Sequence, residues 1–237
     1  MQGGGTEIIM NLKNYFSKAE TALWSSSAAI IIAFFFVFDR ESYMTLAASL
    51  IGVTSLILNA KGNPIGQFLT VVFSLFYGII SFTFRYYGEM LTYLGMTMPM
   101  AIVALVSWIK NPYKGNKAEV KINRITKKEA VFMWLAAALV TFIFYFVLEF
   151  FSTANIVPST VSVTTSFIAV YLTFKRDPRY AIGYATNDIV LIVLWVLAAV
   201  EDIGYISVAA CFAAFLANDI YGFYNWKRME KRQSLNL

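Results

Sequence analysis

The chain has 237 residues, of which 59% are hydrophobic and 14% are charged, and its formal net charge at pH 7 is +5. This composition is too apolar for a water-soluble globular protein and predicts an all-α membrane protein with several spans. There is no histidine and one cysteine, Cys211, which excludes disulfides within the chain, thiolate metal sites and histidine-based acid–base catalysis. We therefore expect no cofactor, metal or nucleic-acid partner, and we attribute the positive charge to loops at the surface of a lipid bilayer.

Taken from the N-terminus, the mixed polar residues 1–20 are expected to form a cytoplasmic leader without the pattern of a cleavable signal peptide. Eight apolar runs follow that are long enough, or nearly long enough, to cross a bilayer core about 30 Å thick. The runs cover residues 22–38, 43–60, 64–84, 89–109, 128–148, 157–174, 179–200 and 203–226.

The fourth of these runs contains a proline, Pro99, with Met96 and Met100 beside it. Proline within a helix removes one backbone hydrogen bond, so this run is expected to be kinked.

One connection, residues 110–127, is strongly basic and carries a single acid, Glu119. Positively charged short loops remain on the cytoplasmic side of a membrane, so we expect this loop to be cytoplasmic. With eight spans, all of the 19 lysines and arginines except Arg40 and Arg85 then fall on that side. The charge distribution therefore predicts that both termini are cytoplasmic.

Two stretches, 43–109 and 157–227, follow the same plan and predict an internal repeat of three helices. After its first run, each stretch has a turn with proline, Lys61–Pro64 or Lys175–Pro178. After its second run, each has an acidic turn, Gly88-Glu89 or Glu201-Asp202. Each stretch ends near a tryptophan, Trp108 or Trp226. The linking helix 128–150 gives both repeats the same orientation, a plan known from transporters. An extra N-terminal helix, 21–40, precedes the repeats, and a basic cytoplasmic tail, 228–237, follows them.

The candidate site centres on two Asn-Asp pairs, Asn187-Asp188 and Asn218-Asp219, inside the last two runs. Asp188 is nine residues from Arg179, and Asp219 is eight residues from Lys227, which places both about 12–14 Å from the same membrane face. Ionisable groups at such depth are costly and are typical of a substrate or ion pathway. The alternative is a pair of buried hydrogen bonds between helices.

Polar and aromatic side chains recur at intervals of three and four residues on the third, seventh and eighth runs, which places them on helix faces. Such faces suit a small solute that is both polar and aromatic, and carboxylates with aromatic rings also suit a delocalised cation. Ordinary packing is the alternative for the aromatic residues alone. The residues expected to bind substrate are Asn59, Gln67, Ser74, Tyr77, Tyr180, Tyr184, Asn187, Asp188, Trp195, Asn218, Asp219 and Tyr221.

The stretch NDIYGFYNWKR, from Asn218 to Arg228, resembles the end of the last helix in the PnuC family of bacterial nicotinamide riboside (vitamin B3) transporters. The plan of three, one and three helices resembles the same family and, more distantly, the SWEET sugar transporters. The resemblance covers residues 40–232. It implies a multi-pass protein of the bacterial cytoplasmic membrane, facilitated diffusion of nicotinamide riboside through a midplane site, trapping by a cytoplasmic kinase, and a homotrimer.

The chain departs from this family at one part of the site. The family carries two tryptophans three residues apart and an asparagine four residues further on. Here the matching positions are Tyr180, Gly183 and Asn187, with Tyr184 next to the glycine. Thiamine, riboflavin and deoxyribonucleosides therefore remain alternative substrates for the same fold and mechanism.

Functions of two other classes would each require particular residues inside the spans. A membrane-embedded enzyme would depend on Asp188 and Asp219 acting as a carboxylate pair. A retinal-based photoreceptor would need a lysine in the middle of a late span, and no span has one.

Overall fold

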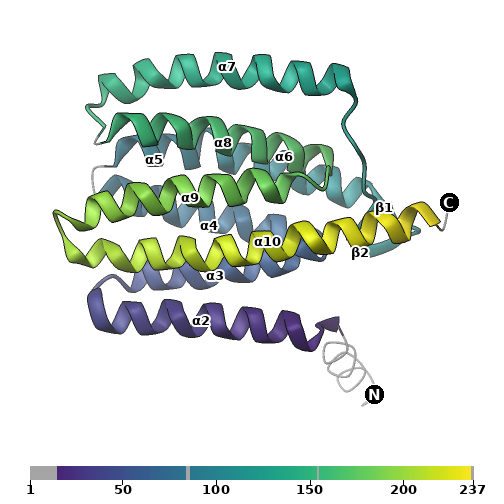
Figure 1. The fold of residues 1–237 in the computed structure, drawn as a ribbon, viewed down its shortest axis with the longest axis horizontal. Coiled ribbons are helices and arrows are strands. Elements are labelled where there is room, and N and C mark those ends of the chain that lie inside the picture. The colour runs from purple at the N-terminus through teal and green to yellow at the C-terminus, as the bar shows by residue number, and fades with distance from the viewer. Residues whose placement is uncertain (1–14, 84–85, 154, 236–237) are drawn as a thin grey trace, which may run out of the picture.

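The computed structural model describes residues 15–83, 86–153 and 155–235, and within them eight helices are long and apolar enough to cross a membrane (Figure 1). The prediction of an all-α membrane protein is confirmed. The helices are α2 (Lys18–Phe38), α3 (Tyr43–Ala60), α4 (Pro64–Thr83), a fourth span of three pieces, α7 (Lys127–Phe150), α8 (Ile156–Lys175), α9 (Tyr180–Ala199) and α10 (Ile206–Leu235). A short 3₁₀ turn, η2 (Ile203–Tyr205), precedes α10.

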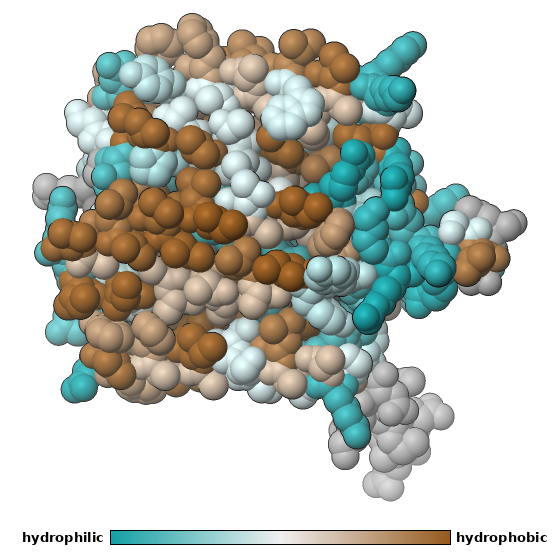
Figure 2. All heavy atoms as spheres, viewed as in Figure 1, coloured by the Kyte–Doolittle hydropathy of each residue, from teal (hydrophilic) through white to brown (hydrophobic). Residues whose placement is uncertain are grey.

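The surface has an apolar belt, and polar residues gather at the end of the bundle that carries the C-terminus (Figure 2). Large side chains on α7 are examples of this belt, since Leu135 is 67% and Phe142 is 64% exposed. An exposed apolar surface of this extent indicates contact with lipid. The chain is therefore a multi-pass membrane protein.

The fourth span is not a continuous α-helix. It consists of α5 (Tyr87–Thr92), a π turn η1 (Tyr93–Thr97) and α6 (Met98–Lys110), and the Met98 N–H donates to the carbonyl of Tyr93. Pro99 has no N–H to donate to the carbonyl four residues earlier, and the wider turn directly precedes it. The sequence predicted a kink at Pro99, and the structure has a π turn in the residues before the proline, in which Tyr93 and Thr97 are buried.

Two turns that connect adjacent spans have the same local structure. Before Pro64, the side chain of Asn63 accepts a hydrogen bond from the N–H of Ile65, at 3.0 Å. Before Pro178, Asp177 accepts one from the N–H of Arg179, also at 3.0 Å. The residues that end the preceding helices, Gly62 and Arg176, have φ of 68° and 61°, the left-handed conformation of a helix C-terminus. These matched turns support the predicted internal repeat.

The basic loop is an ordered structure rather than a simple linker. It begins with an antiparallel hairpin, β1 (Pro112–Tyr113) and β2 (Asn116–Val120). Its turn residues Lys114 and Gly115 have φ of 48° and 80°, as a two-residue hairpin turn requires. We refer to the end of the bundle that carries this hairpin as the hairpin end, and to the opposite end as the far end.

The residues of the predicted basic tail that the structure describes continue the last helix, because α10 extends past Trp226 to Leu235. The hydropathy falls at Trp226, but residues 227–235 are mostly good helix formers. The extension packs on the hairpin: Gln233 donates to the carbonyl of Val120 at 3.1 Å and accepts from the N–H of Ile122 at 2.8 Å.

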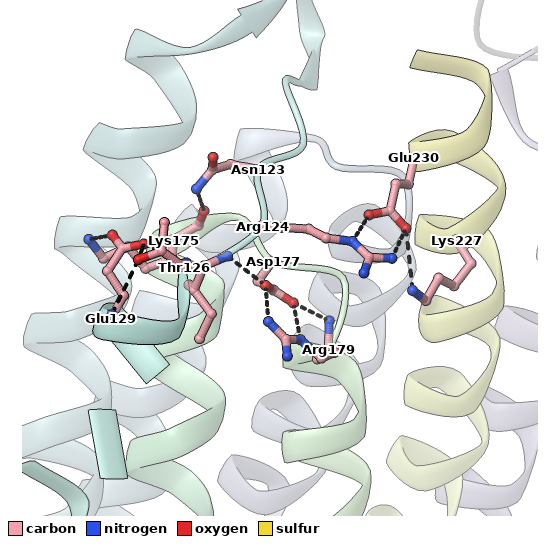
Figure 3. A network of polar contacts seen from close by, with 10 residues as sticks. Asn123, Arg124, Thr126, Glu129, Lys175, Asp177, Arg179, Lys227 and Glu230 are labelled. Carbon is pink, nitrogen blue, oxygen red and sulfur yellow. Dashed lines mark hydrogen bonds and ion pairs between the residues drawn. The ribbon is translucent and has the colours of Figure 1, made fainter. Parts of the chain in front are cut away.

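A polar network holds the rest of the loop against α8, α9 and α10 (Figure 3). Asp177 accepts hydrogen bonds from the Arg179 guanidinium and from the N–H of Ile125, at 2.9 Å. Burial alone would raise the pKa of Asp177, but these hydrogen bonds outweigh it, and the pKa is lowered. Arg124 forms an ion pair with Glu230, and Lys175 forms one with Glu129 at 2.7 Å.

Candidate substrate site: a closed cavity between the helices

A small cavity of about 50 Å³ lies among α3, α4, η1, α8, α9 and α10. Several of the predicted site residues line it together. These are Asn59, Tyr180, Tyr184, Asn187, Asp188 and Asp219.

The two aspartates come from adjacent helices, α9 and α10, and are buried, with 3% and 4% exposure. Their carboxyl groups are close enough to interact directly with each other. Asp188 Oδ2 has no hydrogen-bond partner among the described residues. A buried carboxyl oxygen without a partner is rare, and it is the kind of group that a ligand satisfies.

Asn187 is held in a fixed orientation by α8. Its Oδ1 accepts hydrogen bonds from Thr165 Oγ1 at 2.8 Å and from Ser166 Oγ at 3.0 Å. The amide oxygen is thus occupied by protein hydroxyls, and the NH₂ group remains to donate to a ligand.

Asn59 is held from the opposite side by α4. Gln67 Nε2 donates to Asn59 Oδ1 at 2.9 Å, and Asn59 Nδ2 donates to Thr70 Oγ1 at 3.2 Å. Gly66 allows this close approach, since a Cβ there would lie 2.3 Å from Asn59 Oδ1 and 2.6 Å from its backbone nitrogen. Gln67 therefore does not line the cavity but holds Asn59, which does. Ser74 also lies outside the lining, and its hydroxyl donates to the carbonyl of Thr70.

Asn218 and Tyr221, which we predicted to bind substrate, lie elsewhere. Asn218 Nδ2 donates to Ser27 Oγ of α2 at 2.9 Å, and the Tyr221 hydroxyl donates to Glu20 of α2, also at 2.9 Å. Neighbouring residues on a helix point about 100° apart, so Asp219 faces the cavity while Asn218 faces the extra N-terminal helix.

Aromatic clusters close the cavity at both ends. Toward the far end, Tyr77 packs on Tyr93 with ring centroids 4.4 Å apart and on Trp195 at 6.2 Å. Tyr77 and Trp195 therefore lie between the cavity and the far end, and they do not line the cavity themselves. Toward the hairpin end, Trp108 and Trp226 pack at 5.3 Å, and Tyr180 lies on Trp226 at 4.8 Å.

The two tryptophans at the hairpin end make equivalent hydrogen bonds. Trp108 Nε1 of α6 donates to the carbonyl of Thr173 in α8 at 2.9 Å. Trp226 Nε1 of α10 donates to the carbonyl of Asn59 in α3 at 2.8 Å. In each case, the last helix of one predicted repeat is joined to the first helix of the other.

Several lining residues were missed by the sequence reasoning: Phe73, Tyr93, Thr97, Ser166, Phe212 and Phe215. The phenylalanines cannot be told from core residues by pattern. Tyr93 and Thr97 could have been found from Pro99, because a proline-induced wide turn commonly occurs at a functional site.

Comparisons with known proteins agree with one another. The family model described as "Nicotinamide mononucleotide transporter" matches residues 42–228. Two proteins called "Nicotinamide riboside transporter PnuC" are similar over most of their length. The one from Neisseria mucosa is 26% identical over 90% of this chain and 82% of its own, and the one from Haemophilus influenzae is 22% identical over 89% and 90%.

The fold is also similar to a solved structure described as "Crystal structure of the Vitamin B3 transporter PnuC". The TM-score is 0.82 with 23% sequence identity, and the match covers 98% of this chain and all of the solved one.

Proposed function

The chain belongs to the nicotinamide mononucleotide transporter family, and we propose that it takes up nicotinamide riboside by facilitated diffusion. Membership makes it a membrane transporter and not an enzyme. The observation that carries the choice of substrate is the closed cavity that joins the Asp188 and Asp219 carboxyls to Asn187 and two tyrosines.

The charge of the cavity favours the riboside over the mononucleotide. The riboside has a cationic pyridinium ring and no phosphate, whereas the mononucleotide adds a phosphate group. The described residues that line the cavity include two aspartates and no lysine or arginine. A buried phosphate beside two carboxyl groups would have no compensating charge, so the mononucleotide is disfavoured.

Each lining group has a role in this proposal. Tyr184 and Tyr180 stack on the pyridinium ring, with the aspartates balancing its charge. The Asn187 amide donates to the carboxamide or to a ribose hydroxyl, and Asn59 contributes from the opposite wall. Gly183 is packed against α8, where an added Cβ would lie 2.9 Å from Ala169 Cα, so α9 has no room there for an aromatic side chain.

The cavity must enlarge to hold the substrate. Pockets for small molecules of this size are about 300 Å³ or larger, and the cavity is about 50 Å³. The cavity in this conformation is therefore too small for the riboside. Alternating access would require the aromatic clusters at the two ends to open in turn.

The orientation of the protein in the membrane follows from the charge of its loops. We assign the hairpin end to the cytoplasm because the basic residues of the loop gather there. Phosphorylation of the riboside by a cytoplasmic kinase would add the phosphate that the cavity disfavours, and the product would be trapped. We further propose a homotrimer in the bacterial cytoplasmic membrane, as the resemblance to the PnuC family implies.

Calorimetric titration of the purified protein in detergent tests this function. We expect nicotinamide riboside to bind, and the mononucleotide not to bind. Asn187→Ala and Asp219→Asn should each weaken riboside binding by about tenfold or more, because each removes a hydrogen bond or charge inside a buried site. Thr186→Ala, on the exposed side of α9 next to Asn187, is the matched control and should bind normally.

Thiamine is the second candidate, because its thiazolium ring is also a cation that would suit the aspartate pair. Binding of thiamine without riboside binding would keep the mechanism and replace the substrate. Full riboside binding by both Asn187→Ala and Asp219→Asn would contradict the proposed site.

A further inference from the structure

Glu89 of α5 is a buried carboxyl group that the central cavity does not use. It is 1% exposed, and its Oε2 has no hydrogen-bond partner among the described residues. It lies next to Ser162 of α8, which is also 1% exposed and whose Oγ likewise has no hydrogen-bond partner among the described residues. None of the ion pairs between described residues includes Glu89.

These groups continue the polar lining of the cavity toward the far end. Tyr93, one turn along the span from Glu89, lines the cavity, and Thr97 lines it one turn further. On the facing helix α8, Ser166 lines the cavity, and Ser162 lies one turn nearer the far end. The fourth span and α8 thus carry facing polar side chains that lead from the cavity past Tyr93 to Glu89.

Burying a carboxyl group and a hydroxyl without hydrogen-bond partners destabilises a membrane protein. We therefore expect these two groups to find partners in another conformation of the protein. When the far end opens, water and solutes reach these groups first. The carboxylate then attracts a cation, and the adjacent Tyr93 ring offers a face for it.

We propose that Glu89, with Ser162 and Tyr93, forms an outer binding station that receives a cationic heteroaromatic substrate from the outside and passes it to the central cavity. The identity of the cation rests on the proposed function, since the riboside is the cation that the cavity is expected to hold. The station itself does not depend on which cation is carried.

Transport measurements in proteoliposomes test the station with the riboside. Glu89→Gln should raise the half-saturating concentration for riboside uptake by about tenfold, which corresponds to about 1.4 kcal/mol. Calorimetric riboside affinity should stay within about twofold, since the central cavity is intact. Uptake of the uncharged, reduced form of the riboside should be nearly unaffected by the same change. Glu149→Gln, at an exposed carboxylate of α7 near the same end, is the matched control.

A second measurement needs no substrate. In a Ser162→Cys variant, a cationic methanethiosulfonate reagent should modify the new thiol about fivefold faster or more than an anionic one, after each rate is normalised to that of a free thiol in water. Adding Glu89→Gln should remove the preference, and Glu89→Asp should keep it. The unmodified protein gives the background from Cys211, which is buried.

The two measurements separate the two proposals. If the protein fails to take up the riboside but the thiol shows the charge preference, the substrate assignment is wrong and the station stands. If neither reagent modifies the thiol, or if both react with the same normalised rate, the station is wrong. Equal effects of Glu89→Gln on the charged and uncharged ribosides would also overturn it.

Discussion

At the scale of single residues, the adjacent residues Asn218 and Asp219 face different neighbours. Asp219 lines the cavity, and Asn218 binds Ser27 of the N-terminal helix. On α9 both members of the other pair line the cavity. The difference comes from the neighbours: α10 has the extra helix α2 on its other side, so a polar residue facing away from the cavity finds a partner there.

Gly66 is the residue whose replacement should be most informative at this scale. Gly66→Ala would place a Cβ 2.6 Å from the backbone nitrogen of Asn59, so α3 and α4 must separate. We expect a loss of about 1–3 kcal/mol in the free energy of unfolding and weaker riboside binding, because Asn59 is displaced. Thermal melts and calorimetry check this. Gly95→Ala, where an added Cβ meets nothing within 4 Å, is the control, and an equal loss of stability there would contradict the steric explanation.

At the scale of elements, the π turn in the fourth span places two residues in the lining of the cavity. The wide turn η1 directly precedes Pro99 and turns Tyr93 and Thr97 toward the cavity. An ideal α-helix through the same residues would rotate one side of the span relative to the other. The irregularity therefore serves the site as well as accommodating the proline.

Replacing that proline should straighten the span and move its lining residues. We expect Pro99→Ala to fold, because alanine favours a helix, but to bind riboside about tenfold more weakly as Tyr93 and Thr97 turn away. Calorimetry, with a thermal melt on the same sample, measures both effects. Pro158→Ala, in the first turn of α8 where no N–H is needed, should bind normally. Unchanged affinity of Pro99→Ala would mean that the π turn does not depend on the proline.

At the scale of the whole molecule, equivalent contacts join the two halves at the hairpin end. Trp108 bonds to α8 and Trp226 bonds to α3, and the two indole rings pack on each other. The hairpin loop reaches both matched turns, since Val120 donates to the carbonyl of Gly62 and Ile125 donates to Asp177. This end is therefore closed by contacts between halves.

Removing either indole N–H should weaken this closure to a similar extent. Trp108→Phe and Trp226→Phe each remove one buried hydrogen bond, while the carbonyls of Thr173 and Asn59 keep their backbone donors, so each should cost about 0.5–1.5 kcal/mol and lower the melting temperature by at least about 1 °C. Trp134→Phe is the control, because Trp134 is 59% exposed on α7. A large effect of one replacement and none of the other would contradict the equivalence of the two contacts and weaken the case for the repeat.

The sequence by itself determined the membrane class, the number of spans and most of their ends, because apolar length and loop charge are local properties of the chain. It also singled out Asn187, Asp188 and Asp219, which line the candidate cavity, since polar groups inside apolar runs are visible without a structure. Only the tertiary structure decided which face of each helix meets the cavity. Asn218 was misplaced, Phe73 and Phe212 were indistinguishable from core, and Glu89 read as a residue of an outer turn, because the partner of a side chain depends on which helices pack beside it.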